Sequence, residues 1–178
     1  MTVLPKIYRA CLLSMLLTSC AQDGGPPYFT AQVTDVYKQS VTVERFELLY
    51  WWEERGETPF LKPFSLTSKE VIFEVMQPLR DNPGRVAVVT RRVPFDALDT
   101  LAFELTDTGK QMKLTTKEGQ SITSGMAFPR ELKKDPQAGI ADTKIFVQGL
   151  IERDGRREEY KLPIDYVKLI KITGINGS

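Results

Sequence analysis

The sequence predicts an all-β fold, an antiparallel β-sandwich or a partly open β-barrel of about nine or ten strands. From about residue 30 onward, short segments rich in β-branched and aromatic residues are separated by turn-forming residues. Asn82-Pro83-Gly84 and Asp154-Gly155 are two such turns, and Asp-Gly is typical of a hairpin tip. A unit made of a hairpin and a strand is also weakly repeated. These observations favour a single all-β domain over residues 30–173.

The expected strands begin with residues 40–52, which are rich in β-branched and aromatic side chains and partly alternate. Later strands are expected at 58–64, 70–76, 86–92, 98–106, 110–116, 120–124, 144–152, 158–164 and 167–173. Residues 126–142 lose the alternation and read as a long loop. Within it, residues 129–136 are compatible with one helical turn.

The repeat is clearest between residues 93–103 and residues 162–172. Both segments begin with the pattern apolar-Pro-apolar-Asp and continue with apolar residues at matching positions. Proline supplies no N–H to a ladder, and the following Asp can bond nearby backbone N–H groups. We therefore expect Asp96 and Asp165 to mark corners at which a strand moves between the sheets of a sandwich or around a small barrel. Residues 62–73 form a looser third copy.

The first twenty residues carry a separate signal. Lys6 and Arg9 precede an apolar run at residues 10–17, which is too short for a permanent span of roughly 20 residues. A positive start, a short apolar core and small residues before a cut are typical of an export signal. Leu17-Thr18-Ser19-Cys20 resembles the lipobox of bacterial lipoprotein precursors. The alternatives are an ordinary secretory signal or a buried first helix.

The resemblance implies cleavage between Ser19 and Cys20, with residues 1–19 as the signal peptide. It also implies a diacylglyceryl group on the Cys20 sulfur, and a buried acyl chain contributes about 0.8 kcal/mol per CH₂. Ala21 rather than Asp follows the cysteine, which by the same resemblance favours the outer membrane. Residues 20–29 would form a lipidated, flexible tether, and residues 174–178 a C-terminal tail.

The composition excludes several functions. The chain has no histidine, which excludes Ser-His-Asp and Cys-His catalysis and His-ligated zinc in their usual forms. Its 24 Lys and Arg balance 23 Asp and Glu, and this near-neutral charge argues against nucleic acid as a partner. No motif for a metal or a cofactor is present, and none is expected. Carboxylate, Lys or Tyr chemistry and calcium binding stay open.

Tyr50-Trp51-Trp52 is the most unusual cluster. Adjacent strand residues point to opposite faces, so one Trp should enter the core while the other is more exposed. Trp51 or Trp52 on the surface could contact a protein partner, a glycan or a lipid surface, and the alternative is that both are buried. Carboxylates are also plentiful, and the sequence does not show that any two converge: Glu44, Glu47, Glu53, Glu54, Glu57, Asp96, Asp99 and Asp165.

These observations predict a lipoprotein of the bacterial cell envelope that is not an enzyme and that binds or braces another component. The expected interactions are membrane attachment through acylated Cys20 and contact with an envelope protein. One alternative is a carrier or chaperone for lipids or lipoproteins, which would need an apolar β-barrel cavity. A third hypothesis is a hydrolase for envelope glycans that uses two carboxylates.

Overall fold

The fold is all-β and sandwich-like, as predicted, and its sheet stays open. A computed structural model describes residues 27–55, 60–82, 84–107, 109–125, 128–135 and 137–176. These residues form eleven strands and two short 3₁₀ turns: β1 (Tyr28–Asp35), β2 (Ser40–Arg55), β3 (Leu61–Ser68), β4 (Glu70–Pro78), β5 (Val86–Pro94), β6 (Leu98–Thr106), β7 (Gly109–Thr116), β8 (Ser121–Gly125), η1 (Arg130–Leu132), β9 (Gly139–Arg153), β10 (Arg156–Pro163), η2 (Ile164–Tyr166) and β11 (Val167–Asn176). No helix among the described residues is long and apolar enough to cross a membrane.

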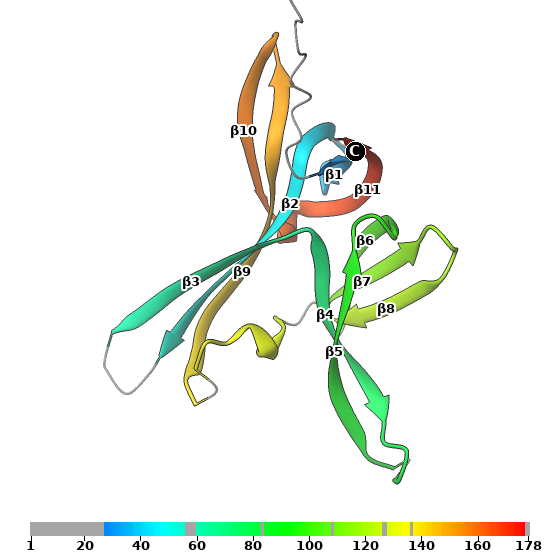
Figure 1. Cartoon of the computed structure of the whole chain (residues 1–178), viewed down its shortest axis with the longest axis vertical. Helices are drawn as coiled ribbons and strands as arrows, with labels where there is room; N and C mark the ends of the chain where they lie inside the picture. The colour runs from blue at the N-terminus through cyan, green and yellow to red at the C-terminus, as the bar shows by residue number, and fades with distance from the viewer. Residues whose placement is uncertain are drawn as a thin grey trace, which may run out of the picture.

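Nine strands form one antiparallel sheet in the order β10-β9-β2-β1-β11-β6-β7-β8, and β3 pairs with β2. Strands β4 and β5 form a separate two-stranded sheet. Three long hairpins, β2–β3, β4–β5 and β9–β10, project from the body of the molecule (Figure 1). Only part of each hairpin therefore contributes to the shared core.

The domain extends beyond both of its expected ends. β1 begins at Tyr28 and β11 ends at Asn176, so the described domain is longer than residues 30–173. Tyr28 and Asn176 face each other in the ladder, and Phe29 lies in the core. Residues 28 and 29 therefore belong to the sheet rather than to a tether. The sequence missed this because Pro26-Pro27 immediately precedes the strand.

Local turn chemistry follows the sequence closely. Asp154 and Gly155 both have positive φ, at 52° and 71°, which is the backbone that a two-residue hairpin turn requires. The expected helical turn in the long loop is η1, a 3₁₀ turn whose Leu132 side chain is buried. Leu132 is thus one of the apolar residues that fix the loop to the core, together with Phe128.

The repeat is visible in the core. Phe95 and Ile164 occupy the two corners after Pro94 and Pro163, and both are buried. The later matching positions are also buried on both copies: Leu98 and Val167, Leu101 and Ile170, Phe103 and Ile172. Asp96 and Asp165 lie at these corners with exposed side chains. At Asp96 the chain passes from the β4–β5 sheet to the large sheet, as expected, whereas β10 and β11 on either side of Asp165 belong to the same sheet. The shared pattern therefore encodes one corner and one inward-facing strand, used twice.

The two copies pair with each other through β6 and β11. Leu101 lies opposite Ile170, its own equivalent in the other copy. The flanking pairs, Leu169 with Ala102 and Lys171 with Thr100, also join equivalent positions crosswise. In this register a local two-fold axis through the Leu101–Ile170 pair relates β6 to β11. The looser third copy does not fit, because Pro63 lies within β3 opposite Glu53 and the corner comes only after Ser68.

A bulge bends β2 where it crosses β9. Glu44 pairs with Leu150 and Glu47 with Gln148, so two residues of β2 lie opposite Gly149 alone. Arg45 within the bulge has a positive φ of 51°. A Cβ atom at Gly149 would lie 2.5 Å from the Glu44 carbonyl oxygen and 2.5 Å from Val43 Cγ1. The bend therefore depends on a residue without a side chain.

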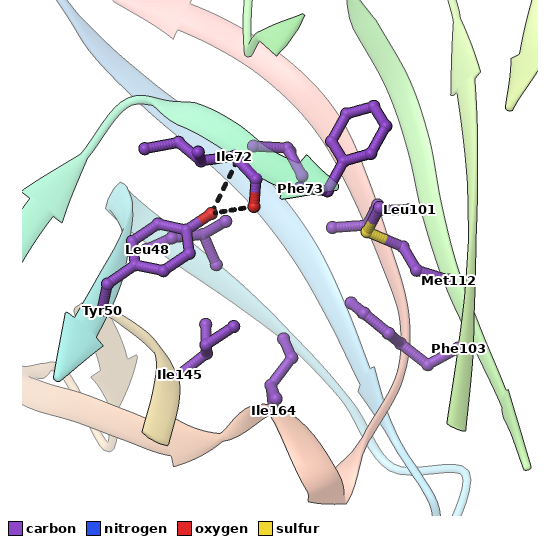
Figure 2. Close-up of a pocket in the computed structure, with 10 residues that line it drawn as sticks. Leu48, Tyr50, Ile72, Phe73, Leu101, Phe103, Met112, Ile145 and Ile164 are labelled. Atoms are coloured by element: carbon purple, nitrogen blue, oxygen red, sulfur yellow. Dashed lines mark hydrogen bonds between the residues drawn. The ribbon is translucent and has the colours of Figure 1, made fainter. Parts of the chain in front are cut away.

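Tyr50 joins the large sheet to the β4–β5 sheet. Its hydroxyl accepts a hydrogen bond from the Ile72 N–H at 2.8 Å and donates to the Ile72 carbonyl at 3.3 Å (Figure 2). Burial raises the pKa of Tyr50 well above its ordinary value, although the hydrogen bond to Ile72 opposes the rise. The hydroxyl therefore stays protonated and can make both bonds.

Replacing Tyr50 with phenylalanine is expected to lower the free energy of unfolding by about 1–2 kcal/mol, because the buried Ile72 N–H loses its partner. Urea denaturation measures this change. Tyr166→Phe is the matched control, since Tyr166 is 50% exposed and its change should be close to zero. Equal effects of the two substitutions would contradict the role of the Tyr50 hydroxyl.

Candidate functional site

The two tryptophans lie on opposite faces of β2, as strand geometry predicts. Trp52 is 1% exposed and packs against Phe64 at 5.7 Å and Phe128 at 5.4 Å between ring centroids. Trp51 is half-buried on the outer face of the sheet. Of the two residues proposed from the sequence as partner contacts, Trp51 alone therefore reaches the surface.

Trp51 belongs to an outward-facing strip that we call the Trp51 surface. It consists of Leu49, Trp51, Lys144, Phe146 and Lys161, which come from β2, β9 and β10. Leu49 lies opposite Phe146, and Trp51 lies opposite Lys144, so the four side chains share one face. The three apolar members are all half-buried.

Two lysines cover the aromatic members of the Trp51 surface. Lys144 Nζ lies 4.9 Å from the Trp51 ring centroid, and Lys161 Nζ lies 4.5 Å from the Phe146 ring centroid. Exposed contacts of this kind are worth about 0.5–1 kcal/mol each. Lys144 also contacts Asp142 at 3.0 Å, and this hydrogen bond lowers the pKa of Asp142. The surface therefore combines flat apolar area with fixed positive charge.

The inner face of β2 carries a buried carboxylate that the sequence analysis did not single out as buried. Glu54 is 3% exposed. It accepts hydrogen bonds from Trp52 Nε1–H at 2.8 Å and from the backbone N–H groups of Lys134 at 2.6 Å and Asp135 at 3.1 Å. Burial raises the pKa of Glu54, but these hydrogen bonds and the nearby Lys133 outweigh it and lower the pKa below 4.5. Glu54 therefore fastens the long loop to β2.

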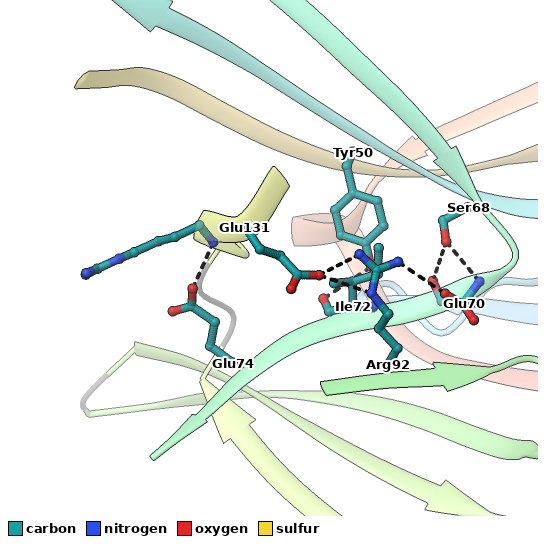
Figure 3. Close-up of polar contacts among 8 residues, drawn as sticks. Tyr50, Ser68, Glu70, Ile72, Glu74, Arg92 and Glu131 are labelled. Carbon is teal, nitrogen blue, oxygen red and sulfur yellow. Dashed lines mark hydrogen bonds and ion pairs between the residues drawn. The ribbon is translucent and has the colours of Figure 1, made fainter. Parts of the chain in front are cut away.

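A second polar cluster fastens the same loop to the β4–β5 sheet. Arg92 donates to Glu131 on η1 at 3.1 Å through Nε–H and pairs with Glu70 on β4 at 3.4 Å (Figure 3). The Arg130 N–H donates to the Glu74 side chain at 2.8 Å. These partners are far apart in sequence, and no local pattern indicated them.

Three of the remaining carboxylates noted in the sequence contact separate partners in the described part of the chain. Glu44 pairs with Arg157 at 3.2 Å, and Glu47 accepts from Gln148 at 3.4 Å. Asp165 lies 3.8 Å from Lys110. Glu57 lies outside the described residues. No group of three or more Asp, Glu, His or Cys side chains that could hold a metal ion occurs within the described ranges.

Lys110 is the half-buried lysine beside the second corner. Its Nζ donates to the Ile164 carbonyl at 2.6 Å and lies 5.3 Å from the Phe103 ring centroid. Burial lowers the pKa of Lys110, and Asp165 opposes this shift. The ammonium group therefore serves as a structural tie to the η2 corner.

The apolar space between the two sheets is small. A cavity of about 20 Å³ lies among Tyr50, Ile72, Leu101, Phe103 and Met112 (Figure 2). This is room for about one water molecule. An acyl chain needs a pocket of several hundred cubic ångströms, so this part of the core cannot hold one.

The lipobox residues Leu17, Thr18, Ser19 and Cys20 lie outside the described residues, and their role stays a prediction. No protein-family model matches the sequence, no curated protein matches it, and no solved structure matches its fold. Function is therefore inferred from the sequence, the fold and the contacts of the described residues.

Proposed function

We propose that this protein is a lipid-anchored component of the bacterial cell envelope that binds another envelope component through the Trp51 surface and catalyses no reaction. The observation that carries the proposal is the outward, half-buried Trp51 within an apolar strip edged by two lysines. Tryptophan is enriched at binding hot spots because a large rigid ring buries much area at a low cost in entropy.

The core between the two sheets has no room for an acyl chain, and the larger hollow of about 640 Å³ beside Phe103 is open and bordered by the charged Lys110 and Asp165; both features support a binding module over a carrier. The cavity between the sheets holds about one water molecule, at 20 Å³. The contacts of the carboxyl groups support a binding module over a glycan hydrolase. Such an enzyme needs an acid with a raised pKa. The two carboxyl groups with resolved shifts, Glu54 and Asp142, both have lowered pKa values and structural partners.

A photo-crosslinking amino acid at position 51 tests the proposal in intact cells. We expect it to form a discrete adduct with one envelope component, because the ring at this position would be covered in the complex. The adduct is detected by electrophoresis and identified by mass spectrometry. The Trp51→Ser protein should also lose that component on purification, while it still folds with a free energy of unfolding lowered by about 1 kcal/mol through the lost ring packing and Lys144 contact.

Position 105 provides the matched control. Leu105 is 87% exposed on β6, away from the Trp51 surface. Adducts at position 105 equal to those at position 51 would mean random collisions and would contradict a docking role. Cys20→Ser tests the anchor in the same cells, since loss of fatty-acid labelling and of membrane fractionation is expected. Unchanged fractionation of the variant would remove the anchor from the proposal.

A further inference from the structure

The β4–β5 hairpin is an arm with no third strand. It forms its own two-stranded sheet and reaches away from the body of the molecule (Figure 1). Its base is buried through Val71, Ile72 and Phe73, whereas the outer half of β4 is exposed. A two-stranded ribbon is marginally stable alone in water, and further strands or packing complete it.

The outer half of the arm carries an exposed apolar face. Met76 is 78% exposed, Val86 is 59% exposed and Val88 is 51% exposed. Met76 lies opposite Val88, and Pro78 lies opposite Val86, so all four side chains share one face of the ribbon. This is the largest group of exposed apolar side chains that cross-strand pairing places together in the described part of the chain.

The free edge of β5 adjoins this face. The Leu79 N–H donates to the Arg85 carbonyl at 2.9 Å, which makes residues 79 and 85 a hydrogen-bonded pair. Bonded and non-bonded pairs alternate in an antiparallel ladder. The N–H and C=O groups of Val86, Val88 and Thr90 therefore point outward, away from β4.

The β5 edge also lacks the features that block strand addition at two other edges of this protein, β3 and β10. β3 carries Lys62 and Pro63, and β10 carries a run of charged residues from Arg156 to Lys161. Charges and proline protect sheet edges from pairing with another chain. Residues 86–90, Val-Ala-Val-Val-Thr, contain neither.

Charge indicates what kind of strand fits this edge. Arg85 precedes the apolar run and Arg91 follows it, and no ion pair of the described residues involves either. Arg91 donates instead to the neutral Gln77 side chain at 3.1 Å. A strand with an apolar centre and an acid at each end would complement this edge.

We propose that β5 accepts an extended segment of a partner protein by antiparallel strand addition, with apolar residues over Val86 and Val88 and acids opposite Arg85 and Arg91. Backbone pairing supplies affinity in this mode, and alternate side chains supply specificity. The surface is separate from the Trp51 surface, so the inference goes beyond the function proposed above. Either one can fail without the other.

The charges disfavour a second copy of this chain as the occupant. In the antiparallel register centred on Val88, Arg85 of one copy would lie opposite Arg91 of the other. Like charges directly opposite each other destabilise a strand pair. A strand with an acidic residue at each end, in the same register, would place a carboxylate opposite Arg85 and another opposite Arg91.

The anchoring membrane is also a poor occupant. The described chain begins at Pro27, beside the Tyr28–Asn176 pair of β1 and β11, which lie in the upper half of the view, and the arm tip lies at the bottom (Figure 1). The segment from Cys20 to Pro27 reaches at most about 25 Å. A lipid anchor at Cys20 would therefore leave the arm pointing away from its own bilayer.

A synthetic peptide, Glu-Val-Thr-Val-Thr-Val-Glu, tests the proposal with the full-length protein in detergent. In antiparallel addition its Val residues face Thr90, Val88 and Val86, and its Glu residues face Arg91 and Arg85. We expect hydrogen-exchange protection of the Val86, Val88 and Thr90 amides on addition of the peptide. A peptide with Lys in place of both Glu residues should bind about tenfold more weakly.

Two edge variants identify the contact. Thr90→Pro removes one outward N–H without removing a ladder bond to β4. The double substitution Val86→Lys and Val88→Lys leaves the backbone intact and places charge on the apolar face. Both should abolish peptide binding, measured by fluorescence anisotropy. Leu105→Lys, an equally polar change at an exposed site on β6, should leave it unchanged.

Several outcomes would overturn the proposal. They include equal binding of the acidic and basic peptides, binding that survives the double lysine variant, and no binding at all. Protection of the same amides without peptide would also overturn it. Protection that rises with protein concentration would mean self-pairing, and protection that appears only in phosphatidylglycerol-containing vesicles would mean contact with a bilayer.

Discussion

Replacing Gly149 with alanine is expected to lower the free energy of unfolding by about 3 kcal/mol, the high end of overpacking costs. The added Cβ would lie 2.5 Å from the Glu44 carbonyl oxygen, 2.5 Å from Val43 Cγ1 and 3.1 Å from the Arg45 carbonyl oxygen. Two of these three atoms are backbone atoms of the bulge, so relief requires a shift of β2 itself. Urea denaturation gives the free energy, and a change of 1 kcal/mol corresponds to about 2–4 °C in Tm at this chain length.

Gly139→Ala is the matched control on the same strand. No atom lies within 4 Å of a Cβ added at Gly139, and its φ is not positive. We expect a change of about 0.5 kcal/mol or less for this variant. If Gly149→Ala proved as mild as Gly139→Ala, the close crossing of β2 and β9 at the bulge would be wrong.

Glu54→Gln is expected to cost about 2–3 kcal/mol, although the two side chains have nearly the same size. Both carboxylate oxygens accept hydrogen bonds: one from Trp52 and Lys134, the other from Asp135. A glutamine side chain has an NH₂ group in place of one of the two carboxylate oxygens. That NH₂ group would point at an N–H donor and could not accept its hydrogen bond. Denaturation midpoints measure the loss. Glu53→Gln is the control, because Glu53 lies on the opposite, outer face of β2 and should change stability little.

The cost of Glu54→Gln should also depend on pH. The pKa of Glu54 in the folded protein lies below 4.5, so the ionised group stabilises the fold fully above about pH 4.5. This contribution is lost as the pH falls through the lowered value. The difference in stability between parent and variant should therefore be constant near neutral pH and shrink below pH 4.5. A difference that grew on acidification would reverse the sign of the pKa shift.

Every described strand except β1 could be predicted from the sequence, because period-two alternation and turn residues are local signals. The opposite faces of Trp51 and Trp52 and the buried positions of the repeat follow from the same periodicity. Strand ends were less certain, since neighbouring strands decide them. Pro63 was expected near a corner, yet it is tolerated within β3 because that strand lies at an edge.

The polar interior of the molecule could not be predicted in the same way. The position of Glu54, after the inward-facing Leu48, Tyr50 and Trp52, was a signal for burial, but two of its three partners lie about eighty residues further along the chain. Arg92 similarly meets Glu131 across a long separation. Nothing local in β4 or β5 indicated that these strands leave the large sheet and form an arm.

The place of β11 in the sheet has a consequence for biogenesis. This strand lies between β1 and β6, so the first and last of the described strands meet near the middle of the sheet. Pairings between such distant segments form slowly, because the entropy of closing the intervening loop must be overcome first. The central ladder cannot be completed until β11 has been synthesised. A chain exported through a membrane pore would therefore arrive with its middle unassembled, and final folding would take place on the far side.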